Sequence, residues 1–358
     1  MTVPRLSHLK GAQDPGTTNA DTPGLTSGRD RKLHGTGRCR QTREAVGVGE
    51  RVIEVRGLVK RYPDITAVDG IGFEVNRGEV FSLLGPNGAG KTTTVEILEG
   101  LRDPTAGEAR VFGEDVRSGY RQIRKRVGVL PQDFEPFDRL RPREAVAYWA
   151  RLFDRPIQPD EVGRILETVG LTSRADTHAM LLSGGEKRRL GIAMALVGDA
   201  DLIFLDEPTT GLDPSARREL WGLVRGLKRA GKTVLLTTHY LDEAQELADD
   251  VAIMNRGKIV AHGSPGDLIS RFGSGTTIVL AGAGAAGHQA LAGRGISAEI
   301  RGSDVLVLVA RANEVRPMLA KLAAIDMRID EIYTQRSNLE DVFLKVVGAR
   351  MREGELAA

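Results

Sequence analysis

The sequence predicts an α/β protein whose core is a parallel sheet covered by helices on both faces. Three apolar runs of strand length, at 79–84, 201–208 and 232–239, lack the alternation of a half-exposed strand. Helical patterns at 91–101 and 215–231 separate them. Continuous apolar strands that alternate with helices are typical of parallel sheets buried on both faces. Ligands bind at the carboxyl ends of such strands, so functional residues should directly follow these runs.

The length and composition limit the class of protein. A chain of 358 residues is long enough for two or three domains, and a net charge of +2 gives no global argument for a nucleic-acid partner. The single cysteine, Cys39, excludes an internal disulfide and fits a reducing compartment. No apolar stretch approaches the roughly 18 residues that span a bilayer, and the first residues lack the apolar core of a signal peptide. Work at a membrane would therefore require another chain.

Residues 1–49 are predicted to form a disordered N-terminal tail. They are rich in Gly, Thr, Asp and Arg and show no periodicity. The basic stretch at 29–43 allows an arm that binds nucleic acid or lipid, but its interspersed acids favour a solvated tail or a start codon assigned too far upstream. Order begins near residue 50, with a strand-like run at 51–62.

A glycine-rich loop follows the first apolar strand. It consists of Gly85, Pro86, Asn87, Gly88, Ala89, Gly90, Lys91, Thr92 and Thr93. The loop fits G-x-x-x-x-G-K-[ST] in full and stands between a strand and a helix, where backbone N–H groups and the helix dipole hold phosphate. We expect Lys91 to reach the β- and γ-phosphates of ATP and the Thr92 hydroxyl to ligate Mg²⁺. The alternative, a flexible turn with a solvated lysine, does not account for the strand–loop–helix context.

Two adjacent carboxylates end the second apolar strand. A strand buried on both faces should end in a turn residue rather than in charges, unless a cation or phosphate site lies there. Asp206 is placed to hold Mg²⁺, directly or through water, and Glu207 is the candidate general base that polarises the attacking water. Two solvated acids at a strand end are the alternative.

The segment 181–190 resembles the signature of ATP-binding-cassette (ABC) ATPases. Ser183, Gly184 and Gly185 head a predicted helix and offer donors to a second anionic ligand. In the family, that ligand is the γ-phosphate of ATP held by a second subunit. The resemblance therefore implies a head-to-tail dimer of two copies, with ATP and Mg²⁺ as cofactors.

This resemblance extends from residue 51 to about residue 272. It implies a P-loop NTPase fold in an ATP-binding domain at 50–272, with a RecA-like parallel sheet and a helical subdomain at about 142–198. The sequence itself shows helical patterns at 142–153 and 160–171.

Four further residues take roles from the resemblance. Tyr62 matches the aromatic that stacks on adenine, although a packing tyrosine is the alternative. Gln132 matches the glutamine that contacts Mg²⁺ and the attacking water and relays to the membrane partner; a surface amide is the alternative. Asp213 matches the loop that crosses the dimer interface, with a helix-capping turn acid as the alternative. His239 matches the switch histidine that bonds the γ-phosphate, whereas a lone histidine is normally structural. The remaining histidines, expected to be surface or packing residues, are His8, His34, His178, His262 and His288.

The pattern changes after Gly273. Strands and helices are predicted in the order βαββαβ, followed by a last helix at 339–347, which suits a small split-βαβ module. We expect residues 273–348 to form an independent α+β domain with a regulatory or dimerisation role, followed by a tail at 349–358.

The stretch 332–348 resembles the C-terminal extension of drug- and antibiotic-resistance exporter ATPase subunits, the daunorubicin type among them. It implies an ATP-hydrolysing subunit, peripheral on the cytoplasmic face of the membrane. That subunit would drive a separate multi-pass permease exporting a drug or other small hydrophobic compound. The segment 133–142, where a permease helix should dock, departs from the family pattern.

Three other functions compete with a transporter subunit. A soluble ABC ATPase acting on ribosomes or nucleic acid usually carries two cassettes or long coiled coils, and this chain shows neither. A non-catalytic regulator is opposed by the intact Lys91, Asp206, Glu207 and His239. A kinase would need an acceptor-substrate domain. We therefore expect no nucleic-acid partner.

Overall fold

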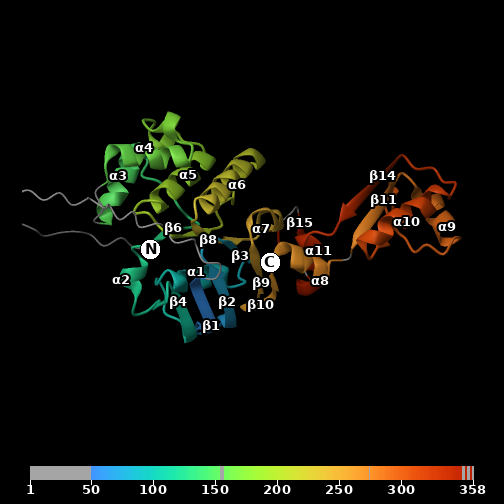
Figure 1. Ribbon diagram of the computed structural model, residues 1–358, viewed down its shortest axis with the longest axis horizontal. Helices are drawn as coiled ribbons and strands as arrows, with labels where there is room; N and C mark the ends of the chain where they lie inside the picture. The colour runs from blue at the N-terminus through green and yellow to red at the C-terminus, as the bar shows by residue number, and fades with distance from the viewer. Residues whose placement is uncertain (1–49, 154–156, 274, 349–350, 353–354, 357–358) are drawn as a thin grey trace, which may run out of the picture. The chain divides into compact units, whose positions relative to one another are not determined.

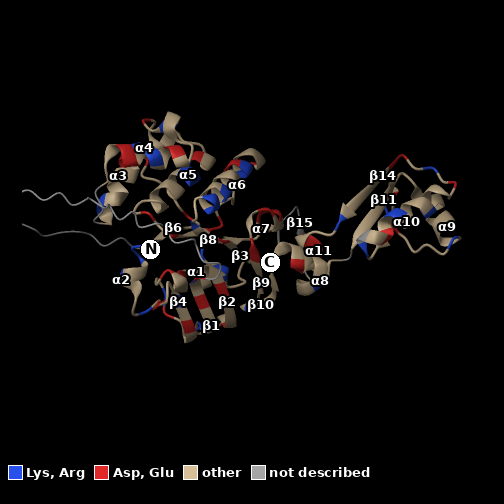
Figure 2. Ribbon diagram, viewed as in Figure 1, with Lys and Arg blue, Asp and Glu red and all other residues tan. Residues whose placement is uncertain are grey.

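The computed structural model describes residues 50–153, 157–273, 275–348, 351–352 and 355–356 (Figure 1). The predicted N-terminal tail and most of the predicted C-terminal tail lie outside these ranges. Acidic and basic side chains are interspersed over the described helices and strands (Figure 2).

A six-stranded sheet forms the centre of the ATP-binding region, in the order β10-β9-β3-β8-β7-β6. Its strands are β3 (Val80–Leu84), β6 (Val127–Leu130), β7 (Leu202–Asp206), β8 (Thr233–Thr238), β9 (Asp250–Asn255) and β10 (Lys258–Gly263). All neighbours pair in parallel except β10, which is antiparallel to β9. Every residue of β3, β7 and β8 is buried. The predicted parallel sheet, buried on both faces, is thus confirmed.

The two faces of this sheet pack into different hydrophobic clusters. Phe81, Phe204 and Leu235 face a cluster shared with helix α1 (Lys91–Leu98) and a second, antiparallel sheet. That sheet has the order β2-β1-β4-β5. Its strands are β1 (Arg51–Arg61), β2 (Thr66–Asn76), β4 (Ala106–Val111) and β5 (Glu114–Asp115), and the short helix α2 (Tyr120–Ile123) follows them.

The other face carries the helical segment that the sequence predicts. Ile203, Leu205 and Val234 pack with α3 (Pro142–Leu152), α4 (Pro159–Thr168), α5 (Gly184–Ala195) and α6 (Pro214–Arg229). Short 3₁₀ turns at Thr172–Arg174 and Ala179–Leu181 join α4 to α5. The helices predicted at 142–153 and 160–171 are therefore present.

The C-terminal module is a four-stranded antiparallel sheet with the order β12-β13-β11-β14. Its elements are β11 (Thr276–Ala281), α9 (Gly284–Ala292), β12 (Glu299–Arg301), β13 (Asp304–Val309), α10 (Ala312–Ala323) and β14 (Glu331–Arg336). This order is the split βαβ arrangement that the sequence predicts. The strands share a core with the two helices, including Ile278, Val307, Leu291 and Leu322.

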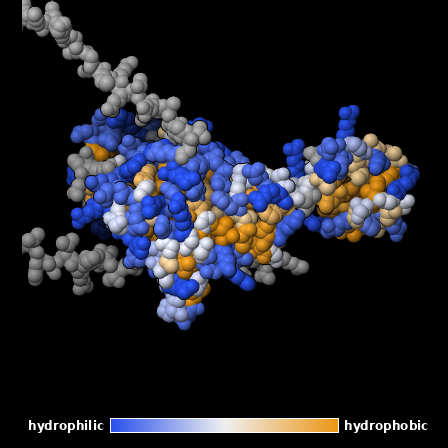
Figure 3. Space-filling model, turned by 60° about the horizontal axis from the view of Figure 1, so that its bottom comes forward, coloured by the Kyte–Doolittle hydropathy of each residue, from blue (hydrophilic) through white to orange (hydrophobic). Residues whose placement is uncertain are grey.

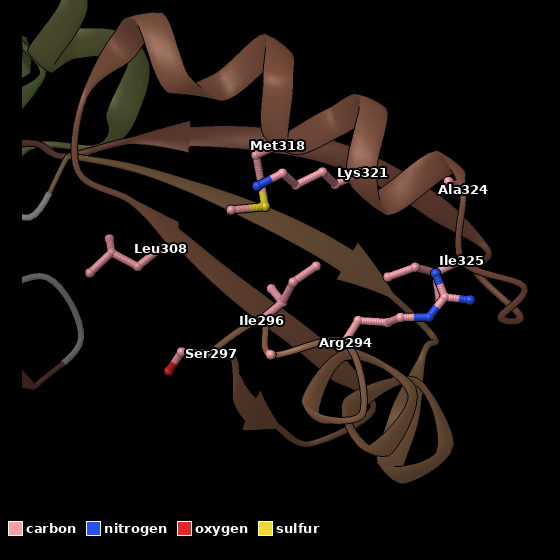
Figure 4. Close-up of a pocket in the computed structure, with 9 residues that line it drawn as sticks. Arg294, Ile296, Ser297, Leu308, Met318, Lys321, Ala324 and Ile325 are labelled. Carbon is pink, nitrogen blue, oxygen red and sulfur yellow. The ribbon is translucent and has the colours of Figure 1, made fainter.

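Apolar side chains also reach the surface of this module. Hydrophobic residues are visible on it in the space-filling view (Figure 3). A hollow lies where the segment after α9 meets the end of α10 (Figure 4). It is lined by Arg294, Gly295, Ile296, Ser297, Leu308, Met318, Lys321, Ala324 and Ile325.

The last helix, α11 (Leu339–Val347), packs with the ATP-binding region rather than with the module that precedes it. Leu339, Val342 and Phe343 are fully buried against α7 (Leu241–Leu247), α8 (Pro265–Phe272) and the strands β9 and β10. The domain expected at 273–348 includes this helix, but its buried side chains belong to the other core. An amphipathic helix shows that it has an apolar face but not which core covers that face. After α11, Met351–Arg352 and Glu355–Leu356 form a two-residue pair, β15 and β16.

Candidate nucleotide-binding site

The glycine-rich loop connects β3 to α1 and is held tightly against neighbouring backbone. Gly85 donates its N–H to the carbonyl of Thr238, at 3.2 Å. A Cβ on Gly85 would collide with the carbonyl oxygen of Met254, and one on Gly90 with that of Ala67. Gly90 also has a φ of 102°, which L side chains rarely adopt. The loop therefore needs glycine at both positions to keep its backbone open toward a ligand.

The start of α1 is free to bind an anion. Gly90 is the N-cap and provides no side-chain acceptor, and the first turn carries no acidic residue. The first N–H groups of a helix have no partner within the helix, and the helix dipole places partial positive charge at them. These groups and the preceding glycine loop form a site suited to phosphate.

Lys91 is buried at the base of this loop, with only 4% of its surface exposed. Its ammonium donates to the carbonyls of Gly85 at 2.8 Å and Pro86 at 3.2 Å, and lies 3.3 Å from Oε1 of Glu207. Burial lowers the pKa of Lys91, while the carboxylate of Glu207 opposes this shift. The cation is thus fixed beside the backbone that would surround a phosphate.

Asp206 and Thr92 face each other across the loop. The Thr92 hydroxyl lies 3.5 Å from Oδ1 of Asp206, which also accepts a hydrogen bond from the Thr237 hydroxyl. Burial raises the pKa of Asp206, so the protein interior favours a cation next to this carboxyl. A hydroxyl and a carboxylate are oxygen donors of the kind Mg²⁺ prefers, so Thr92 and Asp206, two of the three predicted Mg²⁺ ligands, fit that ion.

Glu207 is the centre of the candidate site. Three groups surround its Oε2: Nδ1 of His239 at 3.1 Å, the Thr210 hydroxyl at 3.3 Å and Nε2 of Gln132 at 3.4 Å. Burial alone would raise the pKa of Glu207, but its contacts with His239 and Lys91 outweigh this and lower it to about 2. The carboxylate is therefore ionised at neutral pH. The residues predicted for catalysis thus converge on one carboxylate.

The backbone of Glu207 is strained. Its φ is 45°, in the left-handed region that side chains other than glycine rarely adopt. The N–H donates to the hydroxyl of Thr237 at 3.0 Å and to the carbonyl of the same residue at 3.2 Å. This turn directs the carboxylate away from the strand direction and toward Lys91.

Five predicted residues, Tyr62, Ser183, Gly184, Gly185 and Asp213, lie outside this cluster. Tyr62 lies between β1 and β2, with the cations of Lys60 and Arg102 5.4 and 5.9 Å from its ring centroid. Ser183 caps α5, and its hydrogen bonds are a reciprocal pair with Glu186.

The loop before α6 is also separate from the Glu207 cluster. Asp213 caps α6 through the N–H groups of Ser215 and Ala216, as the helix-capping alternative predicts. A Cβ on Gly185 would lie 3.0 Å from that of Ala216, so the signature and this loop are neighbours. Ser183, Gly184 and Asp213 are exposed.

Sequence reasoning missed two buried residues of the site. Thr237 binds both Asp206 and the backbone of Glu207, and Glu243 accepts a hydrogen bond from Nε1 of Trp221 at 3.1 Å. Glu243 is fully buried, and burial raises its pKa. Thr237 is one of three threonines in β8, so its residue type gave only a weak signal. The sequence offered no comparable signal for Glu243.

Comparison with known proteins decides the family. The profile of the family described as "ABC transporter" matches residues 68–210. The chain is 41% identical over 309 residues to Nod factor export ATP-binding protein I of Burkholderia orbicola (strain AU 1054), an alignment that covers 84% of this chain and 98% of that protein. The chain belongs to the ATP-binding subunits of ABC transporters.

This ABC subunit has a second relative of the predicted exporter type. It is 40% identical over 308 residues to daunorubicin/doxorubicin resistance ATP-binding protein DrrA of Streptomyces peucetius, covering 83% of this chain and 93% of that protein. Among solved structures it resembles cbiO1 from Clostridium perfringens, described as part of the ABC transporter complex cbiONQ. The TM-score is 0.58 at 28% identity, covering 63% of this chain and 93% of that one.

The predicted family, fold and activity are thereby confirmed. The ABC subunit is an ATPase of an exporter-type transporter, and nothing supports action on ribosomes or nucleic acid. Within the described ranges, no helix combines the length and apolarity needed to cross a bilayer.

Proposed function

We propose that this ABC subunit binds ATP with Mg²⁺ at residues 85–93 and powers a separate permease that exports a drug or other small hydrophobic compound. It would act from the cytoplasmic face of the membrane, bound to the permease. The observation that carries this proposal is the convergence of Lys91, Asp206, Glu207 and His239 at the ends of adjacent parallel strands. The cargo class rests on the two relatives, named for daunorubicin/doxorubicin resistance and for Nod factor export.

In this proposal each residue of the cluster has a separate task. Lys91 and the first N–H groups of α1 bind the β- and γ-phosphates, and Thr92 and Asp206 hold Mg²⁺, aided by Gln132. When bound, Mg²⁺ supplies Lewis-acid stabilisation of the phosphate oxygens. Glu207 orients the attacking water and accepts its proton, while His239 donates to the γ-phosphate.

The pairing of Lys91 with Glu207 links nucleotide binding to the strength of the base. While Nδ1 of His239 lies 3.1 Å and the ammonium of Lys91 3.3 Å from Glu207, both lower the pKa of that carboxylate and make it a poor proton acceptor. Phosphate would compete for the ammonium, and the pKa of Glu207 would then rise toward a catalytic range. The base would thus become effective only when substrate is bound.

Each complete site would require two chains. Ser183 and Gly184 are exposed at the start of α5. The capping bonds between Ser183 and Glu186 leave the first N–H groups of that helix available to an anion. Closed two-fold pairing would place this helix start of one copy on the γ-phosphate bound by the other. Asp213, next to the signature, would lie in the same interface, and Tyr62 would stack on the adenine.

Reconstitution tests the proposal. The chain is purified in mild detergent with the multi-pass membrane protein that accompanies it, and the complex is placed in vesicles with ATP. We expect ATP-dependent transport of a hydrophobic drug, and no transport with Lys91→Ala at equal complex yield. ATPase activity with no associated membrane protein, or activity stimulated by RNA or ribosomes, would contradict the transporter role.

A further inference from the structure

Strand β14 forms an unprotected edge of the C-terminal sheet. Among the residues that the structure describes, it pairs only with β11, and all six of its residues are exposed. Ile332 and Tyr333 are each 45% exposed. Natural edge strands are usually shielded by proline, lysine, a bulge or short length, because their free N–H and C=O groups pair readily with another strand. β14 contains no proline, lysine or bulge. It is also twice as long as β12, the three-residue strand at the opposite edge.

The register shows which backbone groups point away from the sheet. Ser337 donates its N–H to the carbonyl of Gly275 at 3.1 Å, in line with the pairing of Thr276 with Arg336. Hydrogen-bonded and non-hydrogen-bonded pairs alternate along an antiparallel ladder. The N–H and C=O groups of Ile332, Thr334 and Arg336 therefore point to the free side.

The sequence of this edge is complementary to itself. A two-fold axis perpendicular to the sheet keeps α9 and α10 of both copies on one side, so residues of the same face must lie opposite each other. With the axis at Tyr333, Ile332 lies opposite the other copy's Thr334, and both present free backbone groups. The same register places Asp330 opposite Arg336 twice, and opposite charges across strands stabilise a pair. Within the described residues no ion pair involves Arg336, and Asp330 has only an exposed one, with Arg328 at 3.8 Å.

We propose that β14 pairs with β14 of a second copy and joins two four-stranded sheets into one continuous antiparallel sheet of eight strands. The charged pair and the unshielded edge favour this occupant over an extended segment of another protein. Two copies of this subunit would thus be held together outside the nucleotide sites, and their association would not depend on ATP.

Disulfide cross-linking tests the register. Cys39, the only cysteine, is replaced by serine, and Lys91→Ala is added so that ATP cannot drive association. Tyr333→Cys would face itself across a non-hydrogen-bonded pair, with Cα atoms about 4.5 Å apart, which a disulfide can bridge. Glu331→Cys lies on the same face but opposite Gln335, and Ser303→Cys in the β12–β13 turn reports random collisions. Under mild oxidation of the full chain, we expect Tyr333→Cys to cross-link roughly tenfold faster than either control.

Two further variants test the backbone pairing. Thr334→Pro removes an N–H that points to the free side, whereas Thr334→Ala keeps it. Sedimentation without nucleotide should show dimers for the alanine variant and monomers for the proline variant, with equal melting temperatures as the folding control. Arg336→Asp should also weaken the dimer, and Asp330→Lys added to it should restore association.

Several results would overturn this proposal. One is that cysteines at 331, 303 and 333 cross-link at equal rates. Another is that the wild type is monomeric at micromolar concentration. The third is that monomers bind the permease through β14. Because the assay contains neither nucleotide nor an intact Lys91, its failure would leave the proposed ATPase cycle untouched.

Discussion

The ammonium of Lys91 lies 3.3 Å from Oε1 of Glu207, so the phosphate-loop cation and the expected general base compensate each other's charge in a buried site. An ion pair buried in this way cannot lose one member without leaving the other unpaired. Lys91 also donates to two loop carbonyls, and an alanine at this position would leave both without that donor.

Lys91→Ala should reduce ATP affinity by about 100-fold or more, because it removes the charge directed at the β- and γ-phosphates. Titration with a fluorescent ATP analogue measures this loss, and circular dichroism should show that the fold is kept. Lys232→Ala, which removes a surface lysine paired with Asp199, is the matched control. Near-normal affinity in Lys91→Ala would remove the lysine from its assigned role.

Glu207→Gln should bind ATP, but its rate of ATP hydrolysis should fall by about 100-fold or more, since glutamine keeps the shape and does not accept a proton. The ATP-bound form should accumulate as a dimer on size exclusion. Glu219→Gln, at an exposed glutamate paired with Arg189, should retain the wild-type rate. Turnover of Glu207→Gln within a few-fold of wild type would place the base elsewhere.

Mixed dimers should reveal whether each site uses two chains. In a Glu207→Gln background, Lys91→Ala damages both phosphate loops of a homodimer and Ser183→Arg blocks both signatures. A heterodimer of the two variants has one intact site only if sites are shared between chains. It should trap radiolabelled ATP where neither homodimer does, and a verified heterodimer without trapped ATP would contradict shared sites.

Helix α11 should stabilise the ATP-binding region. Phe343 is fully buried there, so Phe343→Ala should lower the free energy of unfolding by about 3–5 kcal/mol. A chain that ends at residue 272 should melt at a lower temperature. Replacing residues 276–336 with a short Gly-Ser linker should leave the melting temperature unchanged. Such a linker can join the two ends, because a Cβ on Gly273 would lie only 2.9 Å from that of Ser337. Equal melting of all three chains would show that α11 contributes nothing.

His262 should stabilise the fold in a pH-dependent way. A hydrogen bond with Asp250, at 2.9 Å, raises the pKa of His262 above 6.5, against the effect of burial. The stabilisation is therefore complete below pH 6.5 and lost as the pH rises through the folded pKa. His262→Gln should cost about 0.5 kcal/mol at pH 5.5 in denaturant unfolding, because the pair is partly exposed, and almost nothing at pH 9. His178→Gln, whose ring contacts the Arg139 carbonyl, is the control, and a pH-independent cost at 262 would contradict the ion pair.

The proximity of the expected site residues was predictable from the sequence, because strand ends bring their chain positions together. Lys91, Asp206, Glu207 and His239 each follow a buried strand or start a helix, so the parallel sheet alone places them at one edge. The strained turn at Glu207 was not predictable, since nothing in the residue type signals a positive φ. Thr237 was missed because a threonine is equally at home in a strand without any functional contact.

Packing between distant segments was the harder part. The pattern of 339–347 predicts an amphipathic helix, and that helix is present as α11. Its partner, however, is separated from it by more than sixty residues of an intervening module, and periodicity carries no information about such pairing. For the same reason, the sequence run at 51–62 predicted a strand but not the separate antiparallel sheet that β1 joins.

The positive φ of Glu207 lowers the stability of the fold at the residue proposed to act as the general base. A non-glycine residue held in that region costs on the order of 1 kcal/mol or more, and glycine would remove the cost. Glu207→Gly should therefore unfold at a higher denaturant concentration than Glu207→Ala, although both would be inactive. Selection for stability alone would therefore favour glycine over the proposed general base at this turn. The turn at Glu207 is therefore one that the proposed ATP turnover requires and that the stability of the folded chain alone would not favour.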